Sequence, residues 1–140
     1  MTTQSLYIWF PGTAASALEH YHGIFGGKLT LHTFEEFDRN DGPADAIAHG
    51  VLSGPVKLYA TDAADDEETV SMGGVSIALL GTADGPTLTR WFDALAQNGH
   101  VLDPLQERSW GAYDGQVVDQ FGIRWLIGYG GEASTTRECE

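Results

Sequence analysis

Hydrophobic positions along the chain follow the same pattern twice, at an offset of seventy residues. The repeated apolar positions of two amphipathic segments are Leu18, Tyr21 and Phe25, then Leu88, Trp91 and Leu95. By the same offset, the apolar run Leu6–Phe10 corresponds to Ser76–Leu80. Spacings of three and four residues indicate a helix in each half, and continuous apolar runs indicate strands. The chain is therefore predicted to hold two copies of a unit with one strand, one helix and three further strands.

In the first half, punctuating residues set the predicted ends of the elements. Pro11-Gly12 stops the first strand, Thr13 is expected to cap the helix, and Gly26-Gly27 ends it in a left-handed conformation. Gly54-Pro55 forms the turn between the last two strands. The predicted elements are Leu6–Phe10, a helix to Phe25, Lys28–Phe37, Ile47–Ser53 and Val56–Thr61. Asp62–Thr69, with five acids in eight residues, is expected to be a solvated hinge between the halves.

The second half predicts the same order of elements. Its helix opens at Gly85-Pro86, with Asp84 or Gly85 near the cap, and ends at Asn98-Gly99. The predicted strands are Gly74–Leu80, Val101-Leu102, and a hairpin of Gln116–Asp119 and Ile123–Tyr129 around Phe121-Gly122. Gln106–Gly115 is predicted to be a loop. We expect one domain over 1–130, with modules at about 5–62 and 73–129, and a flexible tail at 131–140.

Composition narrows the classes of partner. A chain of 140 residues is about one domain. Seven basic against twenty acidic residues give a net charge of −13, which argues against nucleic acid and against an anionic membrane surface. No apolar run is long enough for a signal peptide or a membrane span. The single Cys139 allows no internal disulfide, so a reducing, cytoplasmic setting is expected.

An ordered set of short motifs carries a family resemblance over roughly residues 5–129. These motifs are Tyr7–Gly12, Tyr21 with Phe25–Gly27, Ile47–Gly50, Thr61-Asp62, Arg90–Leu95 with Asn98-Gly99, Glu107, Trp110-Gly111, Tyr113, Gly115, and Asp119 with Phe121-Gly122 and Trp125. The chain resembles the vicinal oxygen chelate superfamily, which includes the glyoxalases and bleomycin-resistance proteins. Within it, the chain is similar to the PhnB-type glyoxalase-like branch.

The resemblance implies an α+β fold in which two βαβββ modules form a cupped eight-stranded mixed sheet. It also implies a homodimer and a cleft that holds a small molecule. In metal-dependent members, a His or Glu on the first and last strand of each module binds one divalent cation. Here the corresponding strands Leu6–Phe10, Val56–Thr61, Gly74–Leu80 and Ile123–Tyr129 offer no His or carboxylate. We therefore expect no catalytic metal and no other cofactor.

His49 is the candidate catalytic residue. Alternation places it on one face of its strand with Ile47 and Val51, where it is either a structural imidazole or a general base at near-neutral pH. Asp62, Glu107 or Asp119 are the acids that could orient it. Asp62 and Asp119 also stand beside turns, where a capping role is the plainer interpretation.

Aromatic side chains supply the remaining candidate ligand-binding residues. Trp9 and Tyr59 alternate toward one sheet face, which lines either the pocket or the helix side. Trp110 and Tyr113 fall in a predicted loop bounded by glycines, where they form a lid over a flat ligand or cover a sheet edge or dimer contact. The predicted ligand-binding set is therefore Trp9, Tyr59, Asp62, Glu107, Trp110 and Tyr113.

Three functions follow from these residues. The first is a small-molecule-binding protein without a metal, whose ligand is cationic or aromatic because the chain is acidic and rich in aromatic residues. The second is an enzyme of the superfamily (a lyase, isomerase or dioxygenase) with a relocated site around His49. The third is a dimeric scaffold with a vestigial cleft.

Overall fold

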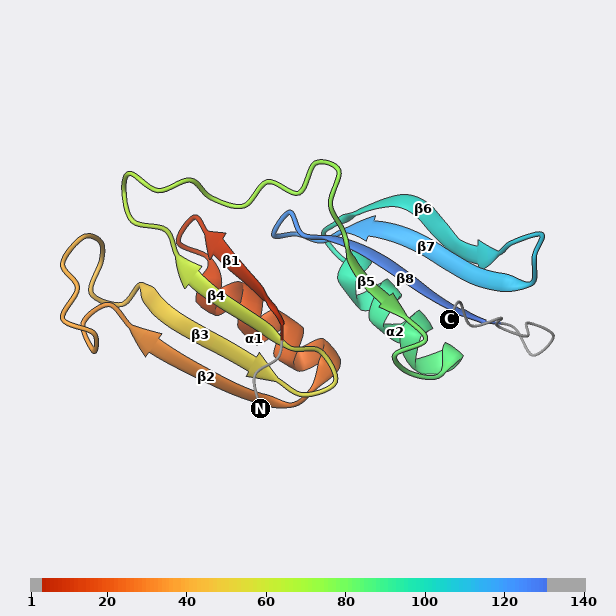
Figure 1. Ribbon diagram of the computed structural model, residues 1–140, viewed down its shortest axis with the longest axis horizontal. Helices are drawn as coiled ribbons and strands as arrows, with labels where there is room; N and C mark the ends of the chain where they lie inside the picture. Colours follow the sequence, from red (N-terminus) through yellow and green to blue (C-terminus); the bar gives the residue numbers. More distant parts are fainter. Residues whose placement is uncertain (1–3, 131–140) are drawn as a thin grey trace. The chain divides into compact units, whose positions relative to one another are not determined.

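The computed structural model describes residues 4–130, which divide after Val70 into two compact units. Each unit holds one βαβββ module (Figure 1). The predicted flexible tail, with Cys139, lies outside the described residues. That the two units form a single domain stays a prediction. In residues 4–130, no helix has the length and apolar character that crossing a membrane requires.

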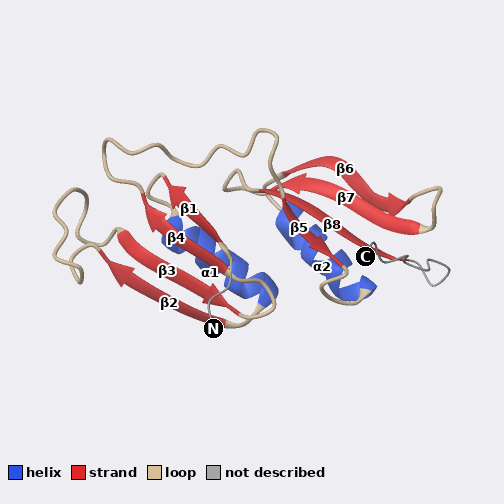
Figure 2. Ribbon diagram, viewed as in Figure 1, coloured by secondary structure: helices blue, strands red, loops and turns tan. Residues whose placement is uncertain are grey.

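Module one is a four-stranded sheet with one helix on one of its faces (Figure 2). Its elements are β1 (Leu6–Phe10), α1 (Ala14–Phe25), β2 (Lys28–Thr33), β3 (Ile47–Ser53) and β4 (Leu58–Asp62). The strand order is β1-β4-β3-β2, with β1 parallel to β4 and the other pairs antiparallel. The face toward α1 is the core, since Leu18 of α1 lies directly against Gly50 of β3. Phe10, Leu52 and Leu58 are buried on this face.

Module two repeats this topology with different strand lengths. Its elements are β5 (Ile77–Leu80), α2 (Gly85–Ala96), β6 (His100–Glu107), β7 (Ala112–Val118) and β8 (Arg124–Gly130). The strand order is β5-β8-β7-β6, again with one parallel pair, β5 and β8. Trp125 and Ile127 of β8 and Val117 of β7 are fully buried, as are Leu88 and Leu95 of α2.

The predicted α+β class and the two βαβββ modules are confirmed. The eight strands form two four-stranded mixed sheets, where one eight-stranded sheet was expected. Both helices span the predicted residues, and Gly26 ends α1 at φ 76° as its lack of a Cβ allows.

The predicted strand Lys28–Phe37 was too long at its end, because β2 stops at Thr33. The Thr33 hydroxyl accepts a hydrogen bond from the Glu36 amide, and the Phe37 amide donates to the Phe34 carbonyl. A side chain that bonds to a backbone amide three residues later in this way favours a turn over a continued strand. Phe34 is then fully buried within the turn.

The largest error concerns β6 and β7. Val101-Leu102 was predicted as a short strand and Gln106–Gly115 as a loop, but β6 and β7 form a long hairpin whose turn is only residues 108–111. Arg108 bridges the hairpin, with its Nε 2.6 Å from Asp114 Oδ1 and its other guanidinium nitrogen bonded to Asp103. Polar side chains and Pro104 hide the alternation that would have identified these strands.

The two helices obtain their N-terminal caps from different parts of the chain. Thr13 is the N-cap residue of α1, as predicted, but its side chain makes no capping hydrogen bond. The Ala14 amide donates instead to Asp62 Oδ1 of β4, over 2.8 Å. At α2, the predicted cap Asp84 accepts from the Thr87 amide over 2.9 Å, with Pro86 in the first turn.

Replacing Asp84 by alanine is expected to lower the melting temperature at neutral pH, because α2 loses its cap. Hydrogen bonding to Thr87 lowers the pKa of Asp84. A carboxylate whose pKa is lowered by folding stabilises the protein above its ordinary pKa, and this contribution is lost as pH falls through the lowered value. The difference between wild type and Asp84→Ala should therefore shrink in strong acid. Thermal melts of both proteins across this range test it, with Asp66→Ala in the exposed acidic segment as the control.

Candidate functional site

The face of the module-one sheet that points away from α1 carries a group of aromatic side chains. Because Gly50 faces α1, its neighbours His49 and Val51 on β3 point to the opposite face. Tyr7 and Trp9 of β1 lie on this face with Tyr59 of β4, since Tyr7 is directly opposite Tyr59 in the parallel pair. We call the side chains of Tyr7, Trp9, His49 and Tyr59 the aromatic face.

These four rings form one connected group around Tyr7, which contacts each of the other three. The Tyr7 ring lies 4.8 Å from Trp9, 5.8 Å from His49 and 6.1 Å from Tyr59, measured between ring centroids. His49 stacks on Tyr59 at 5.8 Å. Tyr7 and Trp9 remain 38% and 39% exposed, although both are large and apolar. A contiguous aromatic surface left open in this way indicates a binding surface.

Tyr7 and His49 also form a polar contact within the aromatic face. The Tyr7 hydroxyl lies 3.2 Å from His49 Nδ1. Burial raises the pKa of the Tyr7 phenol, and the positive charge of Arg39 and the Thr61 hydroxyl offset this only in part. A phenol that keeps its proton can donate to Nδ1, which leaves the imidazole proton on Nε2. The pair then offers a ligand a hydrogen-bond donor beside aromatic rings.

Of the acids proposed to orient His49, two have structural partners instead. Asp62 is 4% exposed, and its two oxygens accept from the Ala14 and Ile47 amides. Asp119 is 3% exposed. Its carboxylate accepts hydrogen bonds from two amides of the turn between β7 and β8 and from the Trp125 indole. These are the capping and turn roles that the sequence also allowed. Neither of these two hydrogen bonds of Asp62 goes to His49.

The other three predicted ligand-binding residues lie in module two. Glu107 ends β6 opposite Tyr113, which stands in β7 and not in a loop as predicted. The Tyr113 ring stacks on Tyr129 at 4.9 Å and 13°. Trp110 lies in the turn at residues 108–111 and is 67% exposed. The structure therefore brings Trp9, His49 and Tyr59 together in module one. It places Glu107, Trp110 and Tyr113 in the β6–β7 hairpin of module two.

The residues at the positions implied for a metal do not fit a divalent cation. The strands concerned are the parallel pairs β1–β4 and β5–β8. On the sheet face that points away from the helix of each module, these pairs present phenol, indole, hydroxyl or aliphatic groups, at Tyr7, Trp9, Tyr59, Thr61, Ala78, Leu80 and Leu126. Divalent sites of this kind need His nitrogens or carboxylates. Within residues 4–130, no group of three or more His, Cys, Asp or Glu side chains could hold a metal ion.

Two residues of this site were not predicted. Tyr7 was not among the predicted site residues, although it stands two residues before Trp9 and so must share its face. Lys57, just before β4, places its Nζ 5.4 Å from the centroid of the Tyr59 ring. The period of two along β1 could have identified Tyr7, and the same period places Lys57 on the face of Tyr59, two residues later.

The chain is similar over most of its length to known proteins. Protein YjdN of Escherichia coli (strain K12) is 28% identical over 137 residues, covering 88% of this chain and 92% of its own. The crystal structure of PA1353 from Pseudomonas aeruginosa superimposes with a TM-score of 0.79 at 28% identity, over 94% of this chain and all (100%) of that one. A PhnB protein from Bacillus cereus has a TM-score of 0.75 at 18% identity, over 92% and 100% of the two chains, which shows a shared fold.

The pattern of one protein family covers nearly the whole described chain. It matches residues 8–127, from β1 to β8, and so includes both modules. The two solved structures named above have the same arrangement of elements, as their TM-scores indicate. The family predicted from the motifs is confirmed, and the chain belongs to the Glyoxalase/Bleomycin resistance protein/Dioxygenase superfamily.

Proposed function

We propose that this chain is a small-molecule-binding protein whose ligand lies against the aromatic face of module one and is held without a catalytic metal. The observation that carries the proposal is the contact of four rings on a sheet face that its own helix leaves open. Ligand sites are lined mainly by aromatic and apolar groups with a few polar ones, and the Tyr7–His49 pair supplies the polar groups here. An enzymatic role of His49 and a scaffold role stay predictions.

A flat cation is the ligand class that this surface favours. Lys57 already lies over the Tyr59 ring, so the ring faces accept positive charge. The net charge of −13 attracts cations to the protein and repels anions. Aromatic cations combine both features, because their rings can stack on Trp9 or Tyr7 while their charge is matched by the quadrupole of the neighbouring rings.

Replacing Trp9 by alanine is expected to weaken binding of an aromatic cation by about tenfold, since one cation–π or stacking contact contributes about 1–2 kcal/mol. A panel of aromatic ammonium compounds is first screened by thermal shift, because a ligand at a hundred times its Kd stabilises a protein by about 2.7 kcal/mol. Isothermal titration calorimetry of the best compound against wild type and Trp9→Ala then gives the ratio of affinities.

Trp110→Ala is the matched control, because it removes an exposed tryptophan from the β6–β7 turn of module two. Binding should be unchanged in this variant. Equal losses in Trp9→Ala and Trp110→Ala, or a loss in Trp110→Ala alone, would contradict a site on the aromatic face. So would stoichiometric nickel, zinc, iron or manganese that purified protein needs in order to bind the compound.

A further inference from the structure

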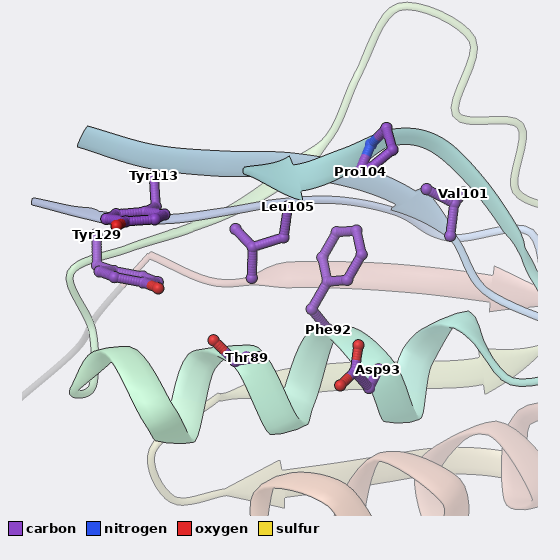
Figure 3. A pocket seen from close by; sticks show the side chains of 8 residues that line it. All are labelled: Thr89, Phe92, Asp93, Val101, Pro104, Leu105, Tyr113 and Tyr129. Atoms are coloured by element: carbon purple, nitrogen blue, oxygen red, sulfur yellow. The ribbon is translucent and has the colours of Figure 1, made fainter. Parts of the chain in front are cut away.

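Module two contains a groove between α2 and the β6–β7 hairpin. The groove lies on the face of the sheet that points toward α2, whereas the aromatic face of module one points away from α1. The groove encloses about 570 Å³, which is within the range of small-molecule sites. Figure 3 shows the Phe92 ring rising from α2 toward Leu105, with Pro104 and Val101 of β6 beyond it. The stacked rings of Tyr113 and Tyr129 close the opposite end.

A bulge in β6 creates this groove. Asp103 pairs with Gln116 and Gln106 pairs with Asp114, so Pro104 and Leu105 together lie opposite the single residue Gly115. A Cβ on Gly115 would lie 2.6 Å from the backbone N and Cα of Leu105, so only glycine admits the bulge. Bulges bend a strand and re-aim its side chains, and they are frequent beside functional sites. Here the bulge turns Leu105 into the space above α2.

The chemistry of the lining is apolar with one negative charge. Asp93 of α2 is the only charged side chain among the eight that line the groove. The nearby Thr89 hydroxyl donates to the Gly85 carbonyl, so toward a ligand it is left as an acceptor. The two tyrosine rings provide a stacking wall at the end of the groove, and Figure 3 places Asp93 on the helix beyond Phe92. The groove therefore has an aromatic end, an apolar middle and an anionic residue at its rim.

We propose that this groove is a second ligand site, distinct from the aromatic face, and that it takes an arylalkyl amine. The aryl group would lie against Tyr113 and Tyr129, the alkyl chain over Leu105 and Phe92, and the ammonium beside Asp93. Charge complementarity selects this class, since the lining has a carboxylate and no Lys, Arg or His. The overall charge of −13 acts in the same direction.

Three probes of one shape and different charge test the proposal: 4-phenylbutylamine, 4-phenylbutanol and 4-phenylbutanoate. In nitrogen-15 correlation spectra of the full chain, the amine should shift the amide signals of Leu105, Tyr113 and Tyr129 at the lowest concentration, and the carboxylate at the highest. Asp93→Asn should weaken the amine about threefold to fivefold, as for an exposed ion pair, and leave the alcohol unchanged. Asp66→Asn removes the same charge from the exposed segment of module one and is the control.

Two further variants fill or neutralise the groove. Leu105→Trp should prevent all three probes from binding. Thr89→Lys places an ammonium four residues before Asp93 on α2, where it can pair with that carboxylate, and should remove the preference for the amine. Because Thr89 is only half-buried at the edge of the groove, Thr89→Lys keeps the test usable if Leu105→Trp does not fold.

Several outcomes would overturn the second site. One is that the amine shifts only signals of Tyr7, Trp9, His49 and Tyr59, which would leave the aromatic face as the site and so support the proposed function alone. Another is equal affinity for the three probes, or no change in Asp93→Asn. A third is that the groove signals shift as the protein concentration rises, without any probe. That result would mean that a second copy of the chain covers the groove. The reverse result, with groove signals shifted and aromatic-face signals constant, supports the second site and counts against the first.

Discussion

Replacing Asp62 by alanine is expected to lower the free energy of unfolding by about 2–4 kcal/mol, because it leaves two buried backbone amides without an acceptor. Asp62 Oδ1 accepts from Ala14, at the first turn of α1, and Oδ2 accepts from Ile47, at the start of β3. Both bonds are 2.8 Å long. One carboxylate on β4 thus joins the helix to two strands of module one.

Urea unfolding followed by circular dichroism measures this loss. Asp62→Asn keeps one acceptor oxygen but presents an amide group to the other N–H, so its loss should be intermediate between wild type and Asp62→Ala. Asp65→Ala, three residues later in the exposed acidic segment, should unfold like wild type. If Asp62→Ala and Asp65→Ala had the same urea midpoint, the two hydrogen bonds of Asp62 would not contribute to stability. That result would favour the predicted ligand-binding role of Asp62.

Replacing Asp119 by alanine is expected to lower the free energy of unfolding by about 3 kcal/mol, since the turn loses three hydrogen bonds and one of them comes from a buried indole. Asp119 Oδ1 accepts from the Phe121 and Ile123 amides, and Oδ2 accepts from the Trp125 indole over 2.8 Å. Trp125 is fully buried, so its indole N–H would have no access to water in the variant.

A double-mutant cycle isolates the indole bond. In a Trp125→Phe background the buried donor is already absent, so Asp119→Ala should cost about 1–2 kcal/mol less than in wild type. Gln120→Ala, an exposed position in the same turn, serves as the control for changes in turn propensity. Additive losses in the cycle would show that Asp119 acts through the turn amides alone.

The sequence predicted the elements that local patterns determine. The helical stripes, the caps at Gly26 and Asp84, and the strand Ile47–Ser53 follow from spacing and from single residues with special conformations. The strand β6 was predicted too short, at Val101-Leu102 alone, because its exposed and bulged residues break the alternation and because Pro104 argues against a strand. A bulge that depends on Gly115 of the partner strand has no signal within β6 itself.

The site was predictable to the extent that residues share a strand face. Trp9, Tyr59 and His49 were predicted as candidates, but the side of the sheet that they occupy depends on where α1 packs. The contact of α1 with Gly50 determines that side, and this contact is visible only in the structure. The acid Asp62 was singled out with two roles, and the role as a cap depends on contacts with Ala14 and Ile47 that lie 48 and 15 residues away. Pairings at such distances are invisible to spacing rules that operate within one element.

The hydrogen bond between Asp62 and Ala14, which are 48 residues apart, affects the order in which the newly made chain folds. During synthesis, α1 leaves the ribosome well before the carboxylate that completes its first turn, whereas α2 is preceded directly by its own cap. A helix of twelve residues is barely stable by itself in water. The nascent α1 is therefore expected to fray until β4 has been made and has docked beside β1, so that the first half becomes ordered in one late cooperative step while the second can begin from its helix.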